Sequence, residues 1–273
     1  MPVSLDEIVA ATRRRVAETK IGVDLRQLER QAGNHVPRGF RQRLESAGAN
    51  GIAVIAELKR ASPSRGLIRP DFDSVSLAKE LESAGAAALS VLTDAEFFQG
   101  SLENLRRASA NIKLPCLRKD FIVDEFQLLE ARANGADAVL LIVAALSQVE
   151  LQVLARRARE HDLDVLCEVH EQEELKRAVD AGCNLIGVNS RDLKTFQVDL
   201  ETSFRLADLI PKNALPVAES GIRSGEDIAR LRAAGYQAFL IGEWLMKAKL
   251  PGEALRALLA EGERVSRADQ KIN

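Results

Sequence analysis

The chain has 273 residues, of which 46% are hydrophobic and 29% are charged, and its formal net charge is −2. This length can bury the core of one large α/β domain or of two smaller ones. The balanced charge and the aromatic content of only 4% argue against nucleic acid as a partner, because nucleic-acid binding relies on basic patches and on rings for base stacking.

Residues 1–50 differ from the rest of the chain and predict an N-terminal helical extension. Ser4 can cap the first helix. The apolar side of this helix would be formed by Leu5, Ile8, Val9 and Thr12. Further helices are expected over residues 23–31 and 40–46, and the arginine run 13–15 is interpreted as a solvated helix face rather than an anion site. We expect the extension to pack on the bottom or the rim of the domain that follows.

From residue 51 onward the chain repeats one pattern, in which a helical segment ends at a glycine and a short apolar strand follows. Each glycine is expected to terminate its helix, because glycine adopts the left-handed conformation at low cost. These glycines are Gly85, Gly135, Gly182 and Gly235. The βαβα unit has a period of about fifty residues, so the chain holds about four such units.

The predicted strands are apolar along nearly their whole length, which is typical of a parallel sheet covered by helices. They are expected at residues 52–58, 88–92, 115–118, 138–143, 164–167, 185–188, 216–218 and 238–241. Strands that alternate with helices in this number fit a closed (βα)8 TIM barrel better than an open sheet. The helix starts lack a G-x-G-x-x-G motif, which argues against a dinucleotide fold. We therefore predict a single domain, with the extension packed on a barrel over residues 51–273.

Polar side chains follow the predicted strands at the end where such a barrel carries its chemistry. Glu57 and Lys59 lie two residues apart and so point to the same face of the first strand. Alone, this pair would be interpreted as a weak surface ion pair. Other strand ends add Thr93, Asp94, Lys119, Asp120, Glu168, Asn189, Arg191, Glu219, Ser220 and Glu243. The fourth strand stays apolar over residues 140–143, so we expect a charged pocket with one apolar wall.

If Lys119 and Glu168 face this pocket, their sequence neighbours face the helices. Cys167 is then a packing residue, and the same is expected of Cys116 and Cys183, because a buried cysteine behaves as a small hydrophobe. An odd number of cysteines and the lack of a signal-peptide pattern indicate a reducing cytoplasm.

The sequence does not predict a metal site. Its carboxylates alternate with lysines rather than clustering with imidazoles, which are the ligands that transition metals prefer. His35 and His161 lie away from the strand ends, and His170, just beyond one, is interpreted as an ordinary loop residue.

Two loops carry glycine after the seventh and eighth strands, where a helix is about to begin: Ser220-Gly221 and Gly242-Glu243. In barrels of this kind, the backbone N–H groups and helix N-termini of these two loops commonly bind phosphate. The alternative is an ordinary turn that happens to contain glycine. We favour a phosphate site because both loops carry glycine together.

Six motifs occur in order between residues 52 and 246. They are IAELKRASPS from Ile55, SVLTD from Ser90, FFQGS from Phe97, LRKDF from Leu117, VNSRDL from Val188 and AESGI from Ala218. In this set and order the chain resembles the indole-3-glycerol phosphate synthase family of the tryptophan pathway. The resemblance implies a carboxy-lyase without a cofactor. Its substrate would be 1-(2-carboxyphenylamino)-1-deoxyribulose 5-phosphate, and its products indole-3-glycerol phosphate, carbon dioxide and water.

The resemblance also implies roles for individual residues. Lys119 would be the general acid on the ketose C2 oxygen, while Glu168 and Lys59 would serve the later dehydration. The other catalytic positions would be Glu57 and Asn189, and the substrate-binding positions Arg191, Glu219, Ser220, Phe97, Phe121, Leu140 and Leu193. The phosphate-binding positions would be Ser62, Gly221, Gly242 and Glu243.

Trp244 departs from the family pattern, which usually has a small residue at this position. Turned inward, its ring would crowd the phosphate, so we expect it to pack outward on the last helix. The expected protein is a monomeric cytoplasmic enzyme for a phosphosugar, without nucleic-acid or membrane partners, and weak contact with other tryptophan-pathway enzymes stays open.

Two other functions stay open from the sequence. A lysine at a strand end could form a Schiff base, as in an aldolase. The chain could also be a catalytically silent barrel that only binds a phosphosugar. The set of Glu57, Lys59, Lys119 and Glu168 argues against the silent barrel, because a binding module needs no paired acids and bases.

Overall fold

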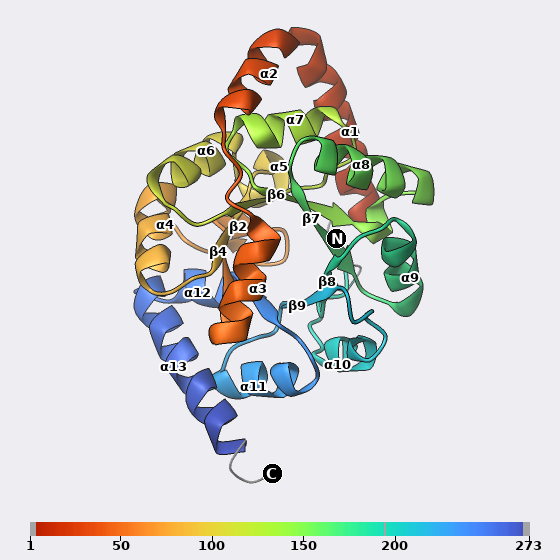
Figure 1. The fold of residues 1–273 in the computed structure, drawn as a ribbon. Helices are drawn as coiled ribbons and strands as arrows, with labels where there is room; N and C mark the ends of the chain where they lie inside the picture. Colours follow the sequence, from red (N-terminus) through yellow and green to blue (C-terminus); the bar gives the residue numbers. More distant parts are fainter. Residues whose placement is uncertain (1–3, 194, 270–273) are drawn as a thin grey trace.

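The computed structural model describes residues 4–193 and 195–269 and contains a closed parallel barrel surrounded by helices (Figure 1). The strand order is β1-β10-β9-β8-β7-β6-β5-β4. The barrel strands are β1 (Ala53–Leu58), β4 (Ala88–Leu92), β5 (Cys116–Lys119), β6 (Ala138–Ile142), β7 (Asp164–Val169), β8 (Leu185–Asn189), β9 (Leu215–Glu219) and β10 (Ala238–Ile241). The predicted (βα)8 barrel with an N-terminal helix is confirmed. The outermost residues of the predicted extension and barrel, 1–3 and 270–273, lie outside the described residues.

Helices cover the outside of the barrel and connect its strands (Figure 1). They are α4 (Ser74–Ser83), α5 (Ala95–Phe98), α6 (Leu102–Asn111), α7 (Phe126–Ala133), α8 (Gln148–Glu160), α9 (Gln172–Asp180), α10 (Glu201–Ala207), α11 (Gly225–Ala233), α12 (Glu243–Lys247) and α13 (Pro251–Asp269), with the 3₁₀ turn η1 (Val143–Ala145). A small antiparallel hairpin, β2 (Ala61–Ser62) and β3 (Gly66–Leu67), follows β1. The glycines predicted to end four helices all have positive φ, between 74° and 105°.

Several strands continue further than predicted. β5, β7, β8 and β9 extend through Lys119, Val169, Asn189 and Glu219, whereas the prediction ended each strand at its last apolar or basic residue. Ladder hydrogen bonds join backbone groups, so a polar side chain does not end a strand; Asn189 still pairs with Glu219. The polar residues at these positions, Glu168 included, are therefore held by strands rather than by loops.

The inward-facing side chains form a core inside the barrel, separate from the core between strands and helices. Its members include Ala53, Ile55, Leu117, Leu140, Leu166, Leu185, Val217 and Leu240. Phe40 and Leu44 of α3 (Phe40–Asn50) are fully buried and belong to the same cluster. The third helix thus closes the bottom of the barrel and leaves the carboxyl ends of the strands open.

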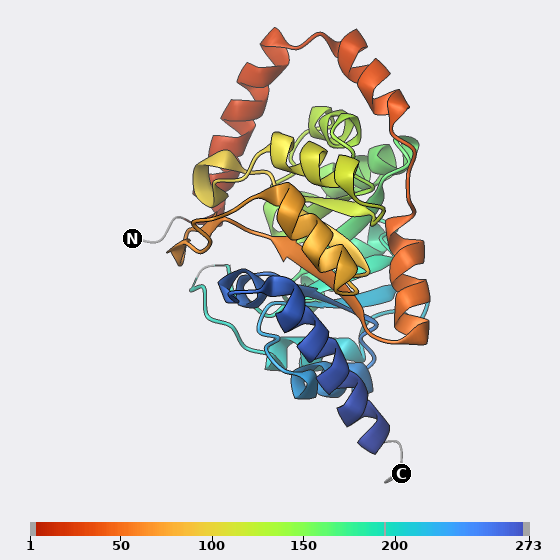
Figure 2. The ribbon, with the colours of Figure 1, turned by 90° about the vertical axis from the view of Figure 1, so that its left-hand side faces the viewer.

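The N-terminal helices reach from the mouth of the barrel to its bottom (Figure 2). α1 (Leu5–Gly22) begins with a capping box, in which the Ser4 hydroxyl accepts from the N–H of Glu7, as its sequence predicts. α2 (Leu25–Asn34) starts later than predicted because Asp24 caps it. The extension therefore occupies both the rim and the bottom, the two places considered from sequence.

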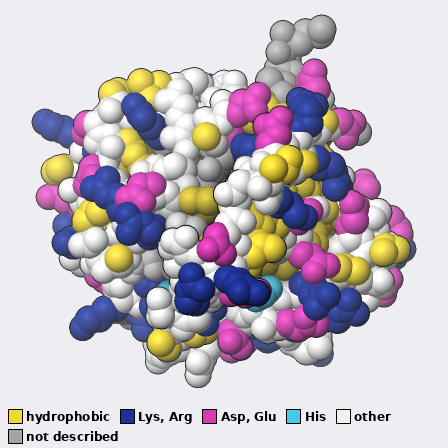
Figure 3. Space-filling view, turned by 90° about the horizontal axis from the view of Figure 1, so that it is seen from above, with side chains coloured by type: hydrophobic (Ala, Val, Ile, Leu, Met, Phe, Trp, Pro, Cys, Tyr) yellow, Lys and Arg dark blue, Asp and Glu magenta, His cyan; other side chains and the backbone are white. Residues whose placement is uncertain are grey.

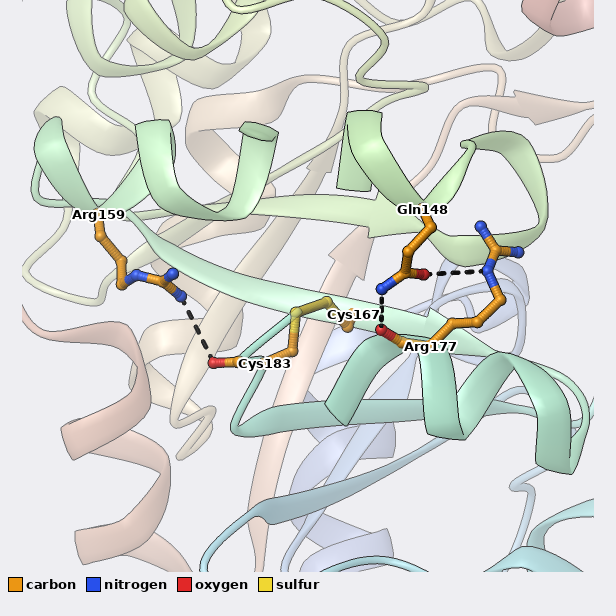
Figure 4. The surroundings of a disulfide bond; sticks show 6 residues. Gln148, Arg159, Cys167, Arg177 and Cys183 are labelled. Atoms are coloured by element: carbon orange, nitrogen blue, oxygen red, sulfur yellow. Dashed lines mark hydrogen bonds between the residues drawn. A yellow bond between two sulfur atoms is a disulfide. The ribbon is translucent and has the colours of Figure 1, made fainter. Parts of the chain in front are cut away.

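Cys167 and Cys183 are joined by a disulfide (Figure 4), so the prediction that both are simple packing residues is wrong. Their Cα atoms lie 6.5 Å apart, within the range that a disulfide spans. The pairing of β7 with β8 brings them together, which a separation of 16 residues does not reveal. Cys116 is buried and free, and burial raises its pKa to about 12.

None of the described helices is long and apolar enough to cross a membrane. The face seen from above Figure 1 carries basic and acidic side chains interspersed with hydrophobic ones (Figure 3). Neither sign of charge dominates this face, in keeping with the formal net charge of −2.

Candidate active site

A cavity of about 770 Å³ opens at the carboxyl ends of the barrel strands. Most of the predicted site residues line it: Glu57, Lys59, Ser62, Lys119, Phe121, Glu168, Asn189, Arg191, Leu193, Glu219, Ser220, Gly221, Gly242 and Glu243. They meet because parallel strands of a closed barrel all end at the same rim. Of the residues that the resemblance assigned to the site, Phe97 and Leu140 do not line the cavity, and of the polar strand-end residues Thr93, Asp94 and Asp120 do not.

Lys119 lies in a cluster of carboxylates on the cavity floor. Its Nζ is 3.0 Å from Glu168 Oε2 and 3.8 Å from Glu219 Oε2, and the Lys119 side chain is only 15% exposed. Burial alone would lower the pKa of Lys119, but Glu168, Glu219 and Glu57 outweigh it and raise this pKa above its ordinary value. Glu57 itself is paired with Lys59. Lys119 is therefore an ammonium at neutral pH.

Glu168 and Glu219 share this ammonium, yet their pKa values shift in opposite directions. Burial opposes ionisation of Glu168, but Lys119 outweighs it and lowers the pKa of Glu168 to about 2. Burial and the charge of Glu168 raise the pKa of Glu219 well above its ordinary value. One ammonium balances one carboxylate, and Glu168 lies closer to it. Glu168 is thus favoured as the ionised carboxylate of the pair, and Glu219 is the one that takes up a proton more readily.

Two inward-facing glycines make room for carboxylates. A Cβ at Gly187 would overlap Glu219 Oε1, and a Cβ at Gly242 would overlap Glu57 Oε1. Gly187 was not among the predicted site residues, although a glycine inside a strand is itself a sign of close approach by another group.

Asn189 connects two strand ends. Its Oδ1 accepts from the backbone N–H of Arg191 at 3.0 Å and from the hydroxyl of Ser220 at 2.8 Å. The Arg191 guanidinium in turn donates to Glu243 at 3.2 Å. These bonds fix the polar wall between the carboxylate cluster and the predicted phosphate end.

The predicted phosphate end is formed by the loops after β9 and β10 and by the β2–β3 hairpin. Ser220 and Gly221 have positive φ values of 66° and 83°, so the chain turns sharply after β9. Ser62 lines the cavity, and its hydroxyl is buried without a hydrogen-bond partner among the described residues. A buried hydroxyl of this kind is available to an oxygen of a ligand.

Glu243 is also an organising residue at this end. Its carboxylate pairs with Arg65 at 3.4 Å, with Arg191 at 3.2 Å and with Lys247 at 2.6 Å. Trp244 borders the cavity but also packs against the core between barrel and helices, as expected for a ring directed toward the helix layer.

The other end of the cavity is apolar. Phe98, Phe121 and Ile142 line it at the ends of β4, β5 and β6, together with Leu5 and Ile8 of α1. Leu193, which follows β8, is a further apolar residue of the lining. The rings of Phe98 and Phe121 pack with centroids 6.2 Å apart. The sequence identified an apolar side of α1 but could not show that Leu5 and Ile8 would reach the mouth of the barrel.

The placement of Phe97 and Leu140 in the cavity wall is corrected by the structure. Leu140 is fully buried in the inner core, one layer below Ile142, because residues on one face of a strand are two apart. Phe97 lies in α5, where its N–H donates to the capping carboxylate of Asp94 at 2.7 Å. The next residue of this short helix, Phe98, is the one that faces the cavity.

Arg15 is not simply solvated, as the arginine run was predicted to be. Its guanidinium pairs with Asp94 at 2.7 Å and lies 3.6 Å from Asp120. Asp120 also accepts from Arg118 at 3.0 Å and from Thr93 at 2.6 Å. These acceptors follow β4 and β5, so they lie behind the cavity wall and fasten α1 beside it.

Residues 62–65 line the cavity, and we expect the segment 60–70 that carries them to act as a mobile lid. The base is fixed, since the Arg60 carbonyl accepts from the N–H of Ile68 at 2.8 Å, while the Arg65 side chain at the tip is 55% exposed. Trypsin cleavage after Arg65 should slow when inorganic phosphate is added, whereas cleavage after exposed Arg106, outside the site, should not. Equal cleavage after Arg65 with and without phosphate would count against the lid.

The phosphate end can be tested at Ser62. Ser62→Ala should raise KM about tenfold, because it removes a hydrogen bond to a charged ligand, and Ser62→Asp should raise KM further by placing like charge there. Gly221 is less suitable, since a side chain there would lie 2.8 Å from Val198 and disturb the loop. Ser46→Asp, at the closed end of the barrel, is the control. Unchanged KM in both Ser62 variants would move the phosphate elsewhere.

The comparisons with known proteins agree with this site. The model of the family described as indole-3-glycerol phosphate synthase matches residues 5–258. A protein of that name from Koribacter versatilis is 60% identical over 259 residues, which cover 95% of this chain and 100% of the relative. Another protein of that name, from Desulfotalea psychrophila, is 47% identical over 255 residues, which cover 93% of this chain and 97% of the relative.

Solved structures of low sequence identity share the fold. A thiamine phosphate pyrophosphorylase from Pyrococcus furiosus is 18% identical, with a TM-score of 0.59 over 82% of this chain and 99% of that chain. KGPDC from Streptococcus mutans is 12% identical, with a TM-score of 0.61 over 78% and 98%. These likenesses show the barrel alone. The sequence matches are far stronger, and they show that this chain belongs to the indole-3-glycerol phosphate synthase family.

Proposed function

We propose that this cavity carries out the reaction of its family, with Lys119 and Glu168 as the principal acid and base. In that reaction 1-(2-carboxyphenylamino)-1-deoxyribulose 5-phosphate loses carbon dioxide and water and becomes indole-3-glycerol phosphate. The observation that carries the proposal is the buried ammonium of Lys119 held between Glu168 and Glu219. It lies in one cavity with an apolar end and a hydroxyl-bearing, cationic end.

The two ends suit the two ends of the substrate. The carboxyphenyl ring would lie against Phe98, Phe121 and Ile142, and the phosphate near Ser62 and the loops after β9 and β10. This orientation places the ketose between them, over Lys119. The wall residues Glu57, Asn189, Arg191 and Glu219 would then contact the sugar hydroxyls and the ring carboxylate.

In the first half of the reaction, the ring carbon that bears the carboxylate attacks the ketose C2. The C2 oxygen receives the electron pair of its double bond, and the Lys119 ammonium supplies the proton. Carbon dioxide then leaves and the aromatic ring is restored. A hydroxyl group remains at C2, and it departs as water in the second half.

Proton donation by Lys119 prepares the second half. While Lys119 is charged, Glu168 has a pKa of about 2 and is a weak base. Once Lys119 has given up its proton, that attraction ends and burial raises the proton affinity of Glu168. Glu168 can then take a proton from C1 of the former ketose, the carbon bonded to nitrogen, while Lys59 protonates the C2 hydroxyl group, which leaves as water.

An absorbance assay tests the proposal directly. The folded protein, mixed with the carboxyphenylamino-deoxyribulose phosphate, should produce indole absorbance and an equal amount of carbon dioxide. Absence of both from folded protein would overturn it. A Schiff-base aldolase instead needs a neutral lysine as nucleophile, and the raised pKa of Lys119, caused by Glu168, Glu219 and Glu57 against burial, speaks for an acid. Borohydride should therefore fail to trap a carbonyl adduct at Lys119.

We further propose a cytoplasmic monomer in which residues 1–50 and the barrel act as one unit. Support for the single unit comes from Leu5 and Ile8, since these residues of the extension line the cavity. In a reducing cytoplasm the bond between Cys167 and Cys183 would open to two buried thiols. Sedimentation of the protein, alone and with other tryptophan-pathway enzymes, tests the oligomeric state and the proposed weak contacts.

A further inference from the structure

His170 lies against the oxygen of Glu168 that Lys119 does not contact. Its Nε2 is 3.5 Å from Glu168 Oε1, whereas Lys119 Nζ is 3.0 Å from Oε2. The His170 side chain is only 15% exposed, and Nε2 has no hydrogen-bond partner among the described residues. A buried ring nitrogen without another partner is thus directed at a carboxylate of the site.

Glu174 holds this ring in place. Its Oε2 accepts from the backbone N–H of His170 at 2.7 Å and lies 3.1 Å from Nδ1. Glu174 sits in the first turn of α9, and this helix is fastened through Arg177, whose guanidinium donates to Gln148 at 3.3 Å (Figure 4) and to the carbonyl of Leu146. The position of the imidazole is therefore set by the fold.

Both ring nitrogens of His170 face a carboxylate, and a neutral ring in either tautomer turns a lone pair toward one of them, so the geometry favours a charged imidazole. A neutral ring that donated from Nδ1 to Glu174 would turn a lone pair on Nε2 toward Glu168, which is repulsive. The charged ring donates toward both carboxylates. Burial would lower the pKa of His170, but Glu174 and Glu168 outweigh it against the opposing charge of Lys119, so this pKa is raised.

We propose that His170, held by Glu174, is a positioning residue that fixes the orientation of Glu168 and keeps it an ionised carboxylate during the reaction. The inference rests on the proposed function of Glu168. It matters most after Lys119 has donated its proton, because His170 is then the cation that still faces Glu168. Without His170, Glu168 Oε1 would lose the contact that orients it, and Glu168 would take up a proton before the dehydration step, in which it has to act as a base.

Variants of His170 test this role. His170→Ala should lower kcat about tenfold to a hundredfold, as expected for a misplaced catalytic group, with KM changed less than about twofold. The acidic limb of the kcat–pH profile of this variant should move to higher pH by about one unit, because loss of a cationic neighbour raises the pKa of Glu168. His170→Gln, whose amide can still donate, should recover most of kcat at neutral pH. His161→Asn, a histidine outside the site, is the control.

A measurement on the unmodified protein covers the case in which His170→Ala does not fold. The imidazole of His170, followed by NMR and assigned by comparison with His35 and His161, should titrate above its ordinary value, and Glu168→Gln should lower that value. The inference is overturned if His170 titrates below its ordinary value. An unchanged kcat–pH profile in folded His170→Ala would also overturn it, provided that Glu168→Gln is impaired. If Glu168→Gln has wild-type turnover, the proposed function fails instead.

Discussion

Lys119→Met should lower kcat by at least about a hundredfold, since one positioned general acid contributes about 10² to 10⁴ in rate. The ammonium stabilises the charge that develops on the ketose oxygen and delivers the proton, and methionine can do neither. The measurement is the steady-state rate of indole formation at saturating substrate. Affinity for indole-3-glycerol phosphate should change much less, because the apolar and phosphate ends of the cavity stay intact.

The same variant should lose stability at neutral pH. Lys119 balances buried Glu168, and removal of one partner of a buried ion pair typically costs about 3–5 kcal/mol unless the other partner takes up a proton. The loss should therefore shrink as the pH falls and Glu168 is neutralised. Lys119→Arg should restore the charge but not the rate, because a guanidinium is too weak an acid. As a control, Lys113→Met replaces an exposed lysine and should leave both kcat and stability unchanged. Near wild-type turnover of Lys119→Met would refute the assignment of Lys119 as the general acid.

Glu168→Gln should lower kcat by about 10² to 10⁴, whereas Glu219→Gln should have the smaller effect on kcat. Glutamine cannot replace the carboxylate that Glu168 presents as a base. At position 219, glutamine resembles the protonated form of the glutamate. Burial and the charge of Glu168 favour this form because they raise the pKa of Glu219. Equal losses of kcat in the two variants would contradict this division of roles.

The stability of these variants should depend on pH in opposite ways. The folded-state pKa of Glu168 is lowered from 4.5 to about 2, chiefly because Lys119 outweighs burial, so its contribution is present above pH 4.5 and lost as the pH falls toward 2. The pKa of Glu219 is raised by burial and by Glu168, so its contribution is lost as the pH rises. Relative to wild type, Glu219→Gln should gain stability with rising pH, and urea unfolding at several pH values measures this.

The barrel and most of its site could be predicted because both follow from local patterns. Apolar strands after helix-ending glycines predict a closed barrel, and a barrel brings all strand ends together. Glu57 and Lys59 point into the same cavity because side chains alternate along a strand. The same rule cannot distinguish two residues that lie two apart on the same face of a strand. The sequence therefore assigned Leu140 to the cavity wall, whereas Ile142 lines the cavity and Leu140 lies in the core below it.

Contacts between segments that are distant in the chain could not be predicted from the sequence. Arg15 reaches Asp94 across 79 residues, and no local pattern distinguishes it from its exposed neighbour Arg14. His170 looked like a loop residue because its significance depends on the direction of its ring, which Glu174 sets. The pairing of Cys167 with Cys183 likewise depends on the neighbouring positions of β7 and β8.

The most direct test of the central claim is a single-turnover experiment that follows carbon dioxide and indole absorbance together in Lys119→Met and Lys59→Met. Ring closure precedes loss of carbon dioxide, and dehydration follows it. Lys119→Met should therefore slow both the release of carbon dioxide and the formation of indole. Lys59→Met should release carbon dioxide at the wild-type rate but form indole slowly. Release of carbon dioxide by Lys119→Met at the wild-type rate would contradict the assignment of Lys119 as the acid of ring closure.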